Sequence, residues 1–352
     1  MRTAGWAAAT VALVTTTLLG AQGAAPARPM NGTLTDVDGL LVGHAVRSER
    51  PTGCTVVVAR AGAIAGVDVR GAAPGTRETD LLHPLNTVEQ VHAVVLSGGS
   101  AFGLDVATGV MSWLEGQGIG FPVGDLRVPI VPAAILFDLG VGDGRIRPDA
   151  ACGREAAASA SRAPVPQGNV GAGAGATVGK LYGMARAMKG GLGSASLLLP
   201  DGTVVAALVA VNARGDVIDP ATGAVVAGVR TEDGRRLADA RALVRRGLPT
   251  PGAPGENTTL GIVATNATLT KVQASLVARM AHDGFARAIS PVHTPMDGDT
   301  IFALATGQRA GAVDVGLIGA VAADVMAQAI VNAVRQAEAL PSLPSARSLG
   351  QP

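Results

Sequence analysis

The sequence predicts an α+β fold in which β-sheets are covered by helices. Segments rich in β-branched residues occur in adjacent pairs, and stretches with apolar residues at helical spacing lie elsewhere in the chain. The 352 residues are 48% hydrophobic, which is enough apolar material for one large core or two smaller ones. Because only 2% of the residues are aromatic, we expect a core of Ala, Val, Leu and Ile.

Each expected element follows from a local pattern. Strands are predicted over residues 54–59, 63–69, 91–96, 194–199, 203–211, 258–265 and 300–306. The turn Pro200-Asp201-Gly202 joins two of them into a hairpin, and the glycines of residues 97–100 form a tight turn into a helix. Helices are predicted over residues 101–115, 231–246, 269–289 and 313–339. The Pro/Ser-rich tail from about residue 340 is expected to be flexible.

The first 27 residues have the order of a signal peptide. Arg2 supplies positive charge, residues 6–20 are apolar, and small residues follow up to Ala27. The apolar run is shorter than the roughly 20 residues that a membrane-spanning helix needs. The sequence therefore predicts export to the periplasm or the medium, cleavage after Ala27 or Gly23, and no stable membrane anchor.

Charge and motif content argue against several function classes. The net charge is +1 without a basic block, so no nucleic-acid partner is expected. The five histidines lack metal-ligand spacing, and Asp297-Gly298-Asp299 offers too few carboxylates for a calcium loop. The glycine-rich residues 98–103 and 171–176 lack the full spacing of a nucleophile elbow or a phosphate-binding loop. No metal or cofactor is expected.

The chain has two cysteines, Cys54 and Cys152. In an exported protein they could form one disulfide. Cys54 opens an apolar strand and Cys152 lies in an Ala-rich helical stretch, so two buried free thiols are at least an equal interpretation.

A Pro/Gly-rich linker ends at Asn257, directly before the strand that begins with Thr258. A threonine hydroxyl becomes a nucleophile when a base removes its proton, and the α-amine of an N-terminal threonine can be that base. Cleavage between Asn257 and Thr258 would create such a terminus. The junction by itself is equally consistent with an ordinary connection between domains.

Six segments together carry a more specific signal. They are Leu96-Ser-Gly-Gly-Ser-Ala-Phe-Gly-Leu-Asp, Pro132-Ala-Ala-Ile-Leu-Phe-Asp-Leu, Gly179-Lys180, Gly190-Gly-Leu-Gly-Ser-Ala-Ser, Asn257-Thr-Thr-Leu-Gly-Ile-Val-Ala-Thr-Asn-Ala and Pro295-Met-Asp-Gly-Asp-Thr-Ile-Phe-Ala. In this order, over residues 33–335, the chain resembles the DmpA-type self-processing aminopeptidase family, which includes the nylon-oligomer hydrolases. The resemblance implies a four-layer αββα sandwich of the Ntn-hydrolase kind. It also implies an α fragment of residues 28–257 and a β fragment of residues 258–352 that stay together, and a homo-oligomer, expected to be a tetramer.

The resemblance also implies roles for individual residues. Thr258 matches the nucleophile, and Asn212 matches a residue that helps to bind the oxyanion. Lys180 matches a lysine near the new amine, where its charge would favour the neutral amine. Asp297 and Asp299 match the acidic pair of the nylon-hydrolase branch, which could orient Thr258 and bind a substrate ammonium.

Structural interpretations compete with three of these roles. Lys180 could be a solvated surface charge, Asn212 could cap a hairpin, and Asp297-Gly298-Asp299 could be a turn before a strand. We expect at least one of the two aspartates to be catalytic, and the other could be structural. Phe137 is assigned to the substrate pocket, at a place where some relatives carry Tyr. A tyrosine-assisted mechanism is therefore in doubt.

The predicted function is hydrolysis of amide bonds in short peptides or amino-acid oligomers that carry a free amine. One alternative is endo-hydrolysis of 6-aminohexanoate oligomers. Acyl transfer to an amine, as in the self-cleaving ornithine acetyltransferases, is a second enzyme class, and a processed binding protein without catalysis is a third interpretation. Export argues against a role in arginine biosynthesis, and the candidate site residues argue against a protein that only binds.

Overall fold

A computed structural model describes Met1, residues 29–247 and residues 257–350 of the chain. The predicted signal peptide, from its second residue on, and most of the Pro/Gly linker lie outside the described residues. The helices are α1 (Val106–Gly116), α2 (Ala150–Ser159), α3 (Ala240–Arg245), α4 (Lys271–Ala288) and α5 (Val315–Arg335). The main sheet contains β1 (Leu40–Val46), β2 (Gly53–Gly71), β3 (Thr76–Arg77), β4 (Gln90–Ser97), β7 (Ala133–Ile135), β10 (Gly191–Leu198), β11 (Val204–Asn212), β14 (Thr258–Ala267) and β16 (Gly298–Arg309). Short strands outside it are β5 (Phe121–Val123), β6 (Leu126–Val128), β8 (Thr177–Val178), β9 (Met188–Lys189), β12 (Asp216–Ile218), β13 (Val225–Ala227) and β15 (Ile289–Ser290).

One long strand, β2, connects two packed sheet layers. Its first half pairs with β1 and β4, whereas its second half, from Ile64 to Gly71, pairs with β16. The strands therefore follow the order β10-β11-β14-β16-β2-β4-β7-β3. The two strands expected over residues 54–59 and 63–69 are parts of this single strand, which has an irregularity between Val58 and Ala63 where it pairs with β4.

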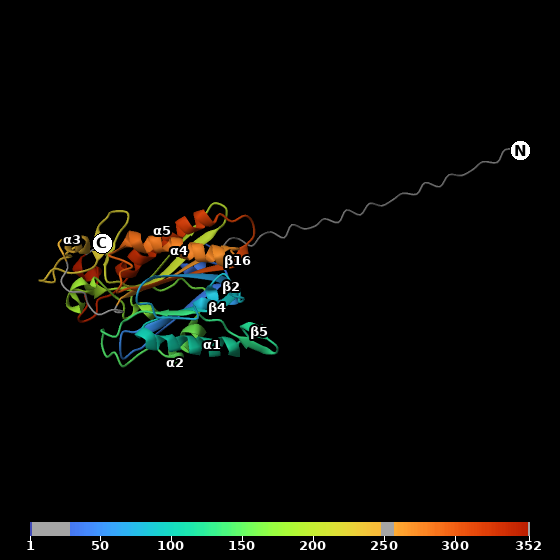
Figure 1. Cartoon of the computed structure of the whole chain (residues 1–352), viewed down its shortest axis with the longest axis horizontal. Helices are drawn as coiled ribbons and strands as arrows, with labels where there is room; N and C mark the ends of the chain where they lie inside the picture. The colour runs from blue at the N-terminus through green and yellow to red at the C-terminus, as the bar shows by residue number, and fades with distance from the viewer. Residues whose placement is uncertain (2–28, 248–256, 351–352) are drawn as a thin grey trace.

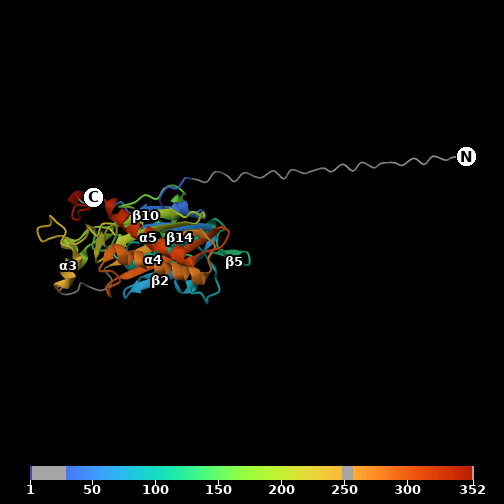
Figure 2. The same ribbon diagram turned by 90° about the horizontal axis from the view of Figure 1, so that it is seen from above.

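Helices cover both outer faces of the sheets, as Figure 1 shows. α4 and α5 pack together on the layer that contains β10, β11 and β16, and α1 and α2 pack on the layer that contains β1 and β4. Seen from above, α4 and α5 lie across the strands that include β14 (Figure 2). The fold is the predicted four-layer αββα sandwich.

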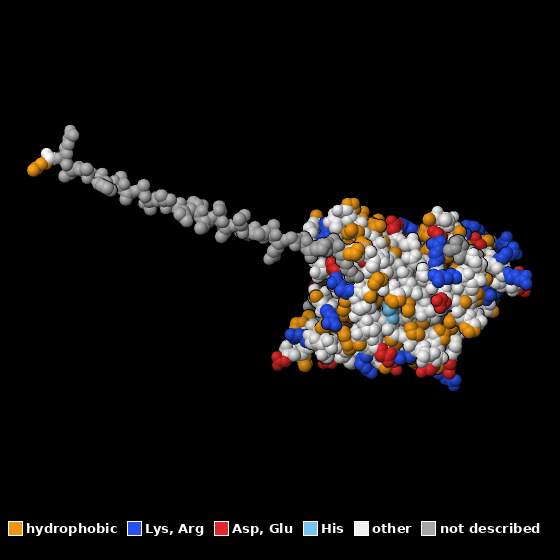
Figure 3. All heavy atoms as spheres, turned by 180° about the vertical axis from the view of Figure 1, so that it is seen from behind, with side chains coloured by type: hydrophobic (Ala, Val, Ile, Leu, Met, Phe, Trp, Pro, Cys, Tyr) orange, Lys and Arg blue, Asp and Glu red, His pale blue; other side chains and the backbone are white. Residues whose placement is uncertain are grey.

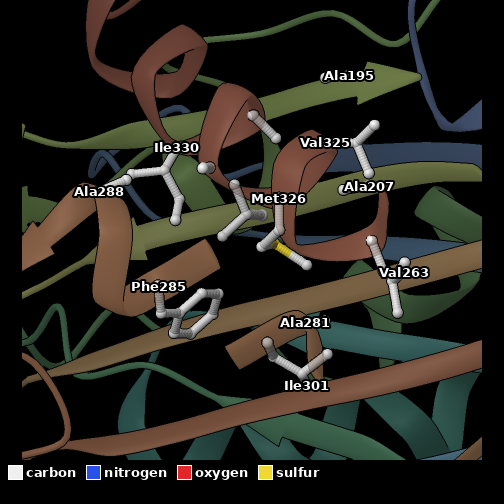
Figure 4. Close-up of a cluster of buried hydrophobic side chains, with 14 of the residues drawn as sticks. Ala195, Ala207, Val263, Ala281, Phe285, Ala288, Ile301, Val325, Met326 and Ile330 are labelled. Atoms are coloured by element: carbon white, nitrogen blue, oxygen red, sulfur yellow. The ribbon is translucent and has the colours of Figure 1, made fainter. Parts of the chain in front are cut away.

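Side chains of alternate residues reach two different cores, because successive strand residues point to opposite faces. In β11, Val205 and Val209 face α5, whereas Ala206 and Leu208 face the other sheet layer. The core under α4 and α5 brings together Phe285 and other residues of the helices with strand residues such as Val263 (Figure 4). As the composition predicted, most of the buried side chains are aliphatic.

Three local predictions differ from the structure. Cys54 and Cys152 form a disulfide that joins β2 to α2, so the interpretation as free thiols is wrong. Residues 231–246 form a helix only from Ala240 to Arg245, because the Asp233-Gly234 turn precedes it and the Thr231 side chain accepts a hydrogen bond from the Arg236 backbone. The segment expected to be a flexible tail is partly packed, with Leu343 and Ala346 buried against the cores.

Among the described residues, only α5 is long and apolar enough to cross a membrane, and most of its apolar stretch is buried inside the protein. The face opposite to that of Figure 1 carries Lys, Arg, Asp and Glu side chains of both signs, dispersed among apolar groups (Figure 3).

Candidate active site

The candidate site forms where the end of β11 meets the starts of β14 and β16. Asn212, the last residue of β11, pairs in antiparallel register with Thr258, the first residue of β14. Asn257 forms a parallel bridge with Asp297, which directly precedes β16. Strand register therefore brings together residues from three distant parts of the chain.

The carbonyl group of Asn257 lies between two hydrogen-bond donors. The Thr258 hydroxyl donates to its oxygen at 2.6 Å, and the Gly298 backbone N–H donates at 3.0 Å. Thr258 and Asn257 are both buried. If the Thr258 hydroxyl attacked this carbonyl, negative charge would develop on an oxygen at which the Gly298 N–H already points.

Close backbone packing explains the glycine at position 298. A Cβ atom there would lie 2.3 Å from the carbonyl oxygen of Ala73, which is far too close. Glycine permits this approach because it has no side chain. The segment 297–299 can therefore place its N–H against Asn257.

Lys180 and Asn212 form one hydrogen-bonded unit. The Lys180 ammonium donates to both the side-chain oxygen of Asn212, at 3.0 Å, and its backbone oxygen, at 3.1 Å. Gly179 precedes Lys180 with φ of 71°, a conformation that favours glycine. Lys180 is thus hydrogen-bonded inside the protein rather than a fully solvated surface charge, and its role near the new amine stays a prediction.

The side-chain nitrogen of Asn212 also has a hydrogen-bond partner. Its Nδ2 donates to the Phe137 carbonyl oxygen at 2.9 Å, and its Oδ1 accepts from the backbone N–H of Thr177. In the uncut chain Asn212 therefore anchors Lys180 and connects three segments. Its role as an oxyanion donor stays a prediction.

The carboxylates of Asp297 and Asp299 are buried and have separate hydrogen-bond partners. Asp299 accepts from the Thr259 backbone N–H at 2.7 Å and pairs with the His293 ring nitrogen Nδ1 at 2.8 Å. Asp297 accepts from the backbone N–H and the hydroxyl of Thr294. Asp299 therefore holds the backbone of Thr259, the residue next to the candidate nucleophile.

Burial and the nearby charge of Asp299 raise the pKa of Asp297 above its ordinary value. The hydrogen bonds from Thr294 and the charge of Lys180 act in the opposite direction. The influence of Lys180 indicates that the cation and the acidic pair share one electrostatic environment.

His293 contacts both Asp299 and a cluster of aromatic rings. It has φ of 53°, and its ring packs against His282 and Phe285, with ring centroids 4.8 and 5.9 Å away. This packing and its bond to Asp299 make His293 a positioning residue for the carboxylate.

A cavity of about 530 Å³ adjoins these residues. Its lining is Phe137, Asp138, Leu139, Gly140, Val141, Thr177, Lys180, Leu181, Tyr182, Gly183, Met184, Arg214 and Asn257. Phe137 thus lies where a pocket residue was expected. Asp297 and Asp299 are absent from this lining, so their binding of a substrate ammonium stays a prediction.

The sequence matches one known protein family. The sequence pattern of Peptidase family S58 matches residues 32–346, which is most of its length. The chain belongs to peptidase family S58.

Relatives within the S58 peptidases cover nearly the whole chain. An uncharacterized aminopeptidase of Mycobacterium tuberculosis is 42% identical over 90% of this chain and 97% of its own length. A 6-aminohexanoate-oligomer endohydrolase of Kocuria sp. is 32% identical over 85% of each chain. The DmpA-type resemblance predicted from the sequence is confirmed.

Solved structures show the same fold. The L-aminopeptidase D-Ala-esterase/amidase of Ochrobactrum anthropi, described as a variant of the Ntn hydrolase fold, matches with a TM-score of 0.66 at 20% identity, over 92% of this chain and 95% of that one. A Burkholderia sp. beta-aminopeptidase also matches with a TM-score of 0.66, at 22% identity over 90% and 92% of the two chains. This S58 peptidase is therefore a hydrolase with an Ntn-hydrolase fold.

Three further groups at the candidate site are not predicted from the sequence. His293 is one of the five histidines whose spacing does not fit a metal site, and its position four residues before Asp297 is the only sequence signal that points to it. The Gly298 N–H is a backbone group, and Arg214 belongs to no motif, so neither carries a signal of its own. In the part of the chain that the structure describes, no three His, Cys, Asp or Glu side chains are grouped as metal ligands would be.

Proposed function

We propose that this S58 peptidase cuts itself between Asn257 and Thr258 and uses the released Thr258 to hydrolyse amide bonds of short substrates with a free amine. The observation that carries the proposal is the environment of the Asn257 carbonyl. Its oxygen accepts bonds from the Thr258 hydroxyl and the Gly298 N–H at the start of a buried strand.

Self-cleavage would proceed as an acyl shift followed by hydrolysis. The Thr258 oxygen bonds to the carbonyl carbon of Asn257, the C–N bond to Thr258 breaks, and the hydroxyl proton passes to the leaving nitrogen. Water then hydrolyses the resulting ester and restores the hydroxyl. The new α-amine of Thr258 is the base for later turnovers, and the nearby Lys180 charge favours its neutral form.

Intact-mass spectrometry with N-terminal sequencing tests the cut. We expect two chains, the smaller beginning at Thr258, and a single chain for Thr258→Ala. A cleaved Thr258→Ala protein, or an uncut wild-type protein with full activity, would contradict the proposal.

Short peptides and 6-aminohexanoate oligomers are the two substrate candidates. Relatives are named for an aminopeptidase and for a 6-aminohexanoate-oligomer endohydrolase, so the two substrate classes should be compared directly. The assay compares a short peptide p-nitroanilide and a 6-aminohexanoate oligomer with their N-acetylated forms. Equal rates after acetylation would show that the free amine is not recognised.

Hydrolysis also has to be distinguished from acyl transfer and from binding without catalysis. Release of amine without an added acceptor supports hydrolysis, whereas release that requires an amine acceptor supports transfer. If cleaved protein turns over no amide, the processed binding protein is favoured.

We also propose that the protein is exported and that it assembles into a homo-oligomer. We expect a mature chain that begins near Arg28 in the exported fraction, and a homotetramer in solution. N-terminal sequencing after cell fractionation and light scattering test these two points. A cytoplasmic protein that starts at Met1, or a monomer, would contradict them.

A further inference from the structure

Arg214 is a buried cation in the candidate site, and the described residues give its side chain no hydrogen-bond or ion-pair partner. Its exposure is 8%, and it lines the cavity beside Lys180 and Asn257. The guanidinium nitrogens are not among the fully buried polar atoms that lack a partner, so they keep contact with the cavity. A guanidinium that lines a cavity without a protein partner is available to pair with an anionic ligand there.

The backbone holds Arg214 in place. It lies in the turn between β11 and β12, where its carbonyl oxygen accepts from the Lys180 N–H at 2.9 Å and the Gly215 oxygen accepts from the Gly179 N–H at 3.0 Å. A Cβ at Gly215 would lie 2.2 Å from the Pro291 oxygen, which shows how tightly the turn is packed. Arg214 and Lys180 are therefore positioned by one shared pair of backbone contacts.

The carboxylate in the cavity lining does not neutralise Arg214. Asp138 pairs with Arg50 at 2.8 Å and also accepts from the Thr52 hydroxyl and the Gly99 N–H. Among the lining residues that the structure describes, Asp138 is the one carboxylate, and its bonds to Arg50, Thr52 and Gly99 leave Arg214 without a neutralising partner. This charge balance favours an anion over an ammonium next to Arg214.

We propose that Arg214 forms a carboxylate-binding subsite that selects short amides bearing a carboxylate group. The proposal rests on the proposed function, because it concerns the substrate of the same site. A planar guanidinium pairs with a carboxylate through two parallel hydrogen bonds. Apolar side chains such as Leu181 and Met184 line the remaining cavity and suit the carbon chain of the substrate.

The carboxylate has two possible sources, and two substrate pairs distinguish them. Ala-Leu and Ala-Leu amide differ at the carboxylate of the leaving group. Glutamyl and glutaminyl p-nitroanilide differ at the acyl side chain. Wild-type protein should prefer the carboxylate member of one pair, and Arg214→Gln should lower kcat/KM for that member by roughly tenfold to a hundredfold, with the neutral member little changed.

Two further variants complete the experiment. Arg214→Lys keeps the charge and should retain part of the preference, whereas Arg127→Gln, an exposed arginine on β6, should retain all of it. Complete self-cleavage of each variant shows that it is folded. No wild-type preference in either pair, or an equal loss on both members in Arg214→Gln, would overturn the proposal. Turnover of the neutral substrates by wild-type protein tests the proposed hydrolase function separately.

Discussion

The backbone N–H of Gly298 donates a 3.0 Å hydrogen bond to the carbonyl oxygen of Asn257, on the residue that precedes the candidate nucleophile. This donor comes from the segment between Asp297 and Asp299, so the acidic pair and the donor share one turn. The Gly298 N–H therefore belongs to the machinery of the proposed self-cleavage, whatever the external substrate.

Gly298→Ala should slow self-cleavage by roughly tenfold or more, because the new Cβ clashes with Ala73 and displaces the N–H. A time course of freshly synthesised precursor on denaturing gels measures the rate. Gly116→Ala is the matched control, since a Cβ at Gly116 meets nothing within 4 Å. Equal cleavage rates in Gly298→Ala and wild type would rule out this role.

Asn212→Ala should lower turnover by roughly a hundredfold or more in fully cleaved protein. The variant removes the amide proposed to stabilise the oxyanion and also the oxygen that anchors Lys180. Steady-state kinetics on a peptide p-nitroanilide measure the effect, and the separated fragments on a gel confirm processing. Near-normal turnover would show that neither contribution matters.

His282 should make stability depend on pH. Burial lowers its pKa from 6.5 to about 3, so the unfolded chain binds this proton more readily than the folded protein does. The contribution of neutral His282 to the free energy of unfolding is fully present above pH 6.5. As the pH falls from 6.5 towards the folded pKa, the free energy of unfolding decreases by about 1.4 kcal/mol per pH unit.

Thermal unfolding of His282→Phe between pH 4 and pH 7 tests this dependence. The variant loses the bond to the Asp68 backbone oxygen, but its Tm should fall less steeply than that of wild type as the pH decreases. His83→Gln, which replaces an exposed histidine, should follow wild type. Parallel pH profiles for His282→Phe and wild type would exclude the linkage.

The disulfide between Cys54 and Cys152 closes a long loop within the α fragment. The double variant Cys54→Ser, Cys152→Ser should be less stable by about 2–5 kcal/mol, chiefly because its unfolded chain is less constrained. Denaturant unfolding measures the difference. Labelling of both cysteines by a thiol reagent in unreduced, denatured wild-type protein would contradict the pairing.

Local patterns predicted the regular elements well where one face of each is buried. The hairpin over residues 194–211 and the helix over residues 269–289 correspond to β10, β11 and α4. Predictions failed where distant contacts decide the outcome. The Cys54 thiol meets Cys152 only when α2 packs on β2, and the C-terminal segment becomes ordered only where Leu343 finds a buried site.

Residue patterns along the chain predicted sheets covered by helices and a linker that ends directly before Thr258. The order of six motifs, which is also visible along the chain, indicated the family, and that resemblance implied the αββα fold and Thr258 as the candidate nucleophile. The groups that surround Thr258 became visible only in the folded chain. The contact of Gly298 with Asn257, the bond of His293 to Asp299 and the burial of Arg214 all depend on the packing of segments that the sequence separates. A backbone N–H or a buried arginine acquires its role from this packing, and such a role leaves no local pattern in the sequence.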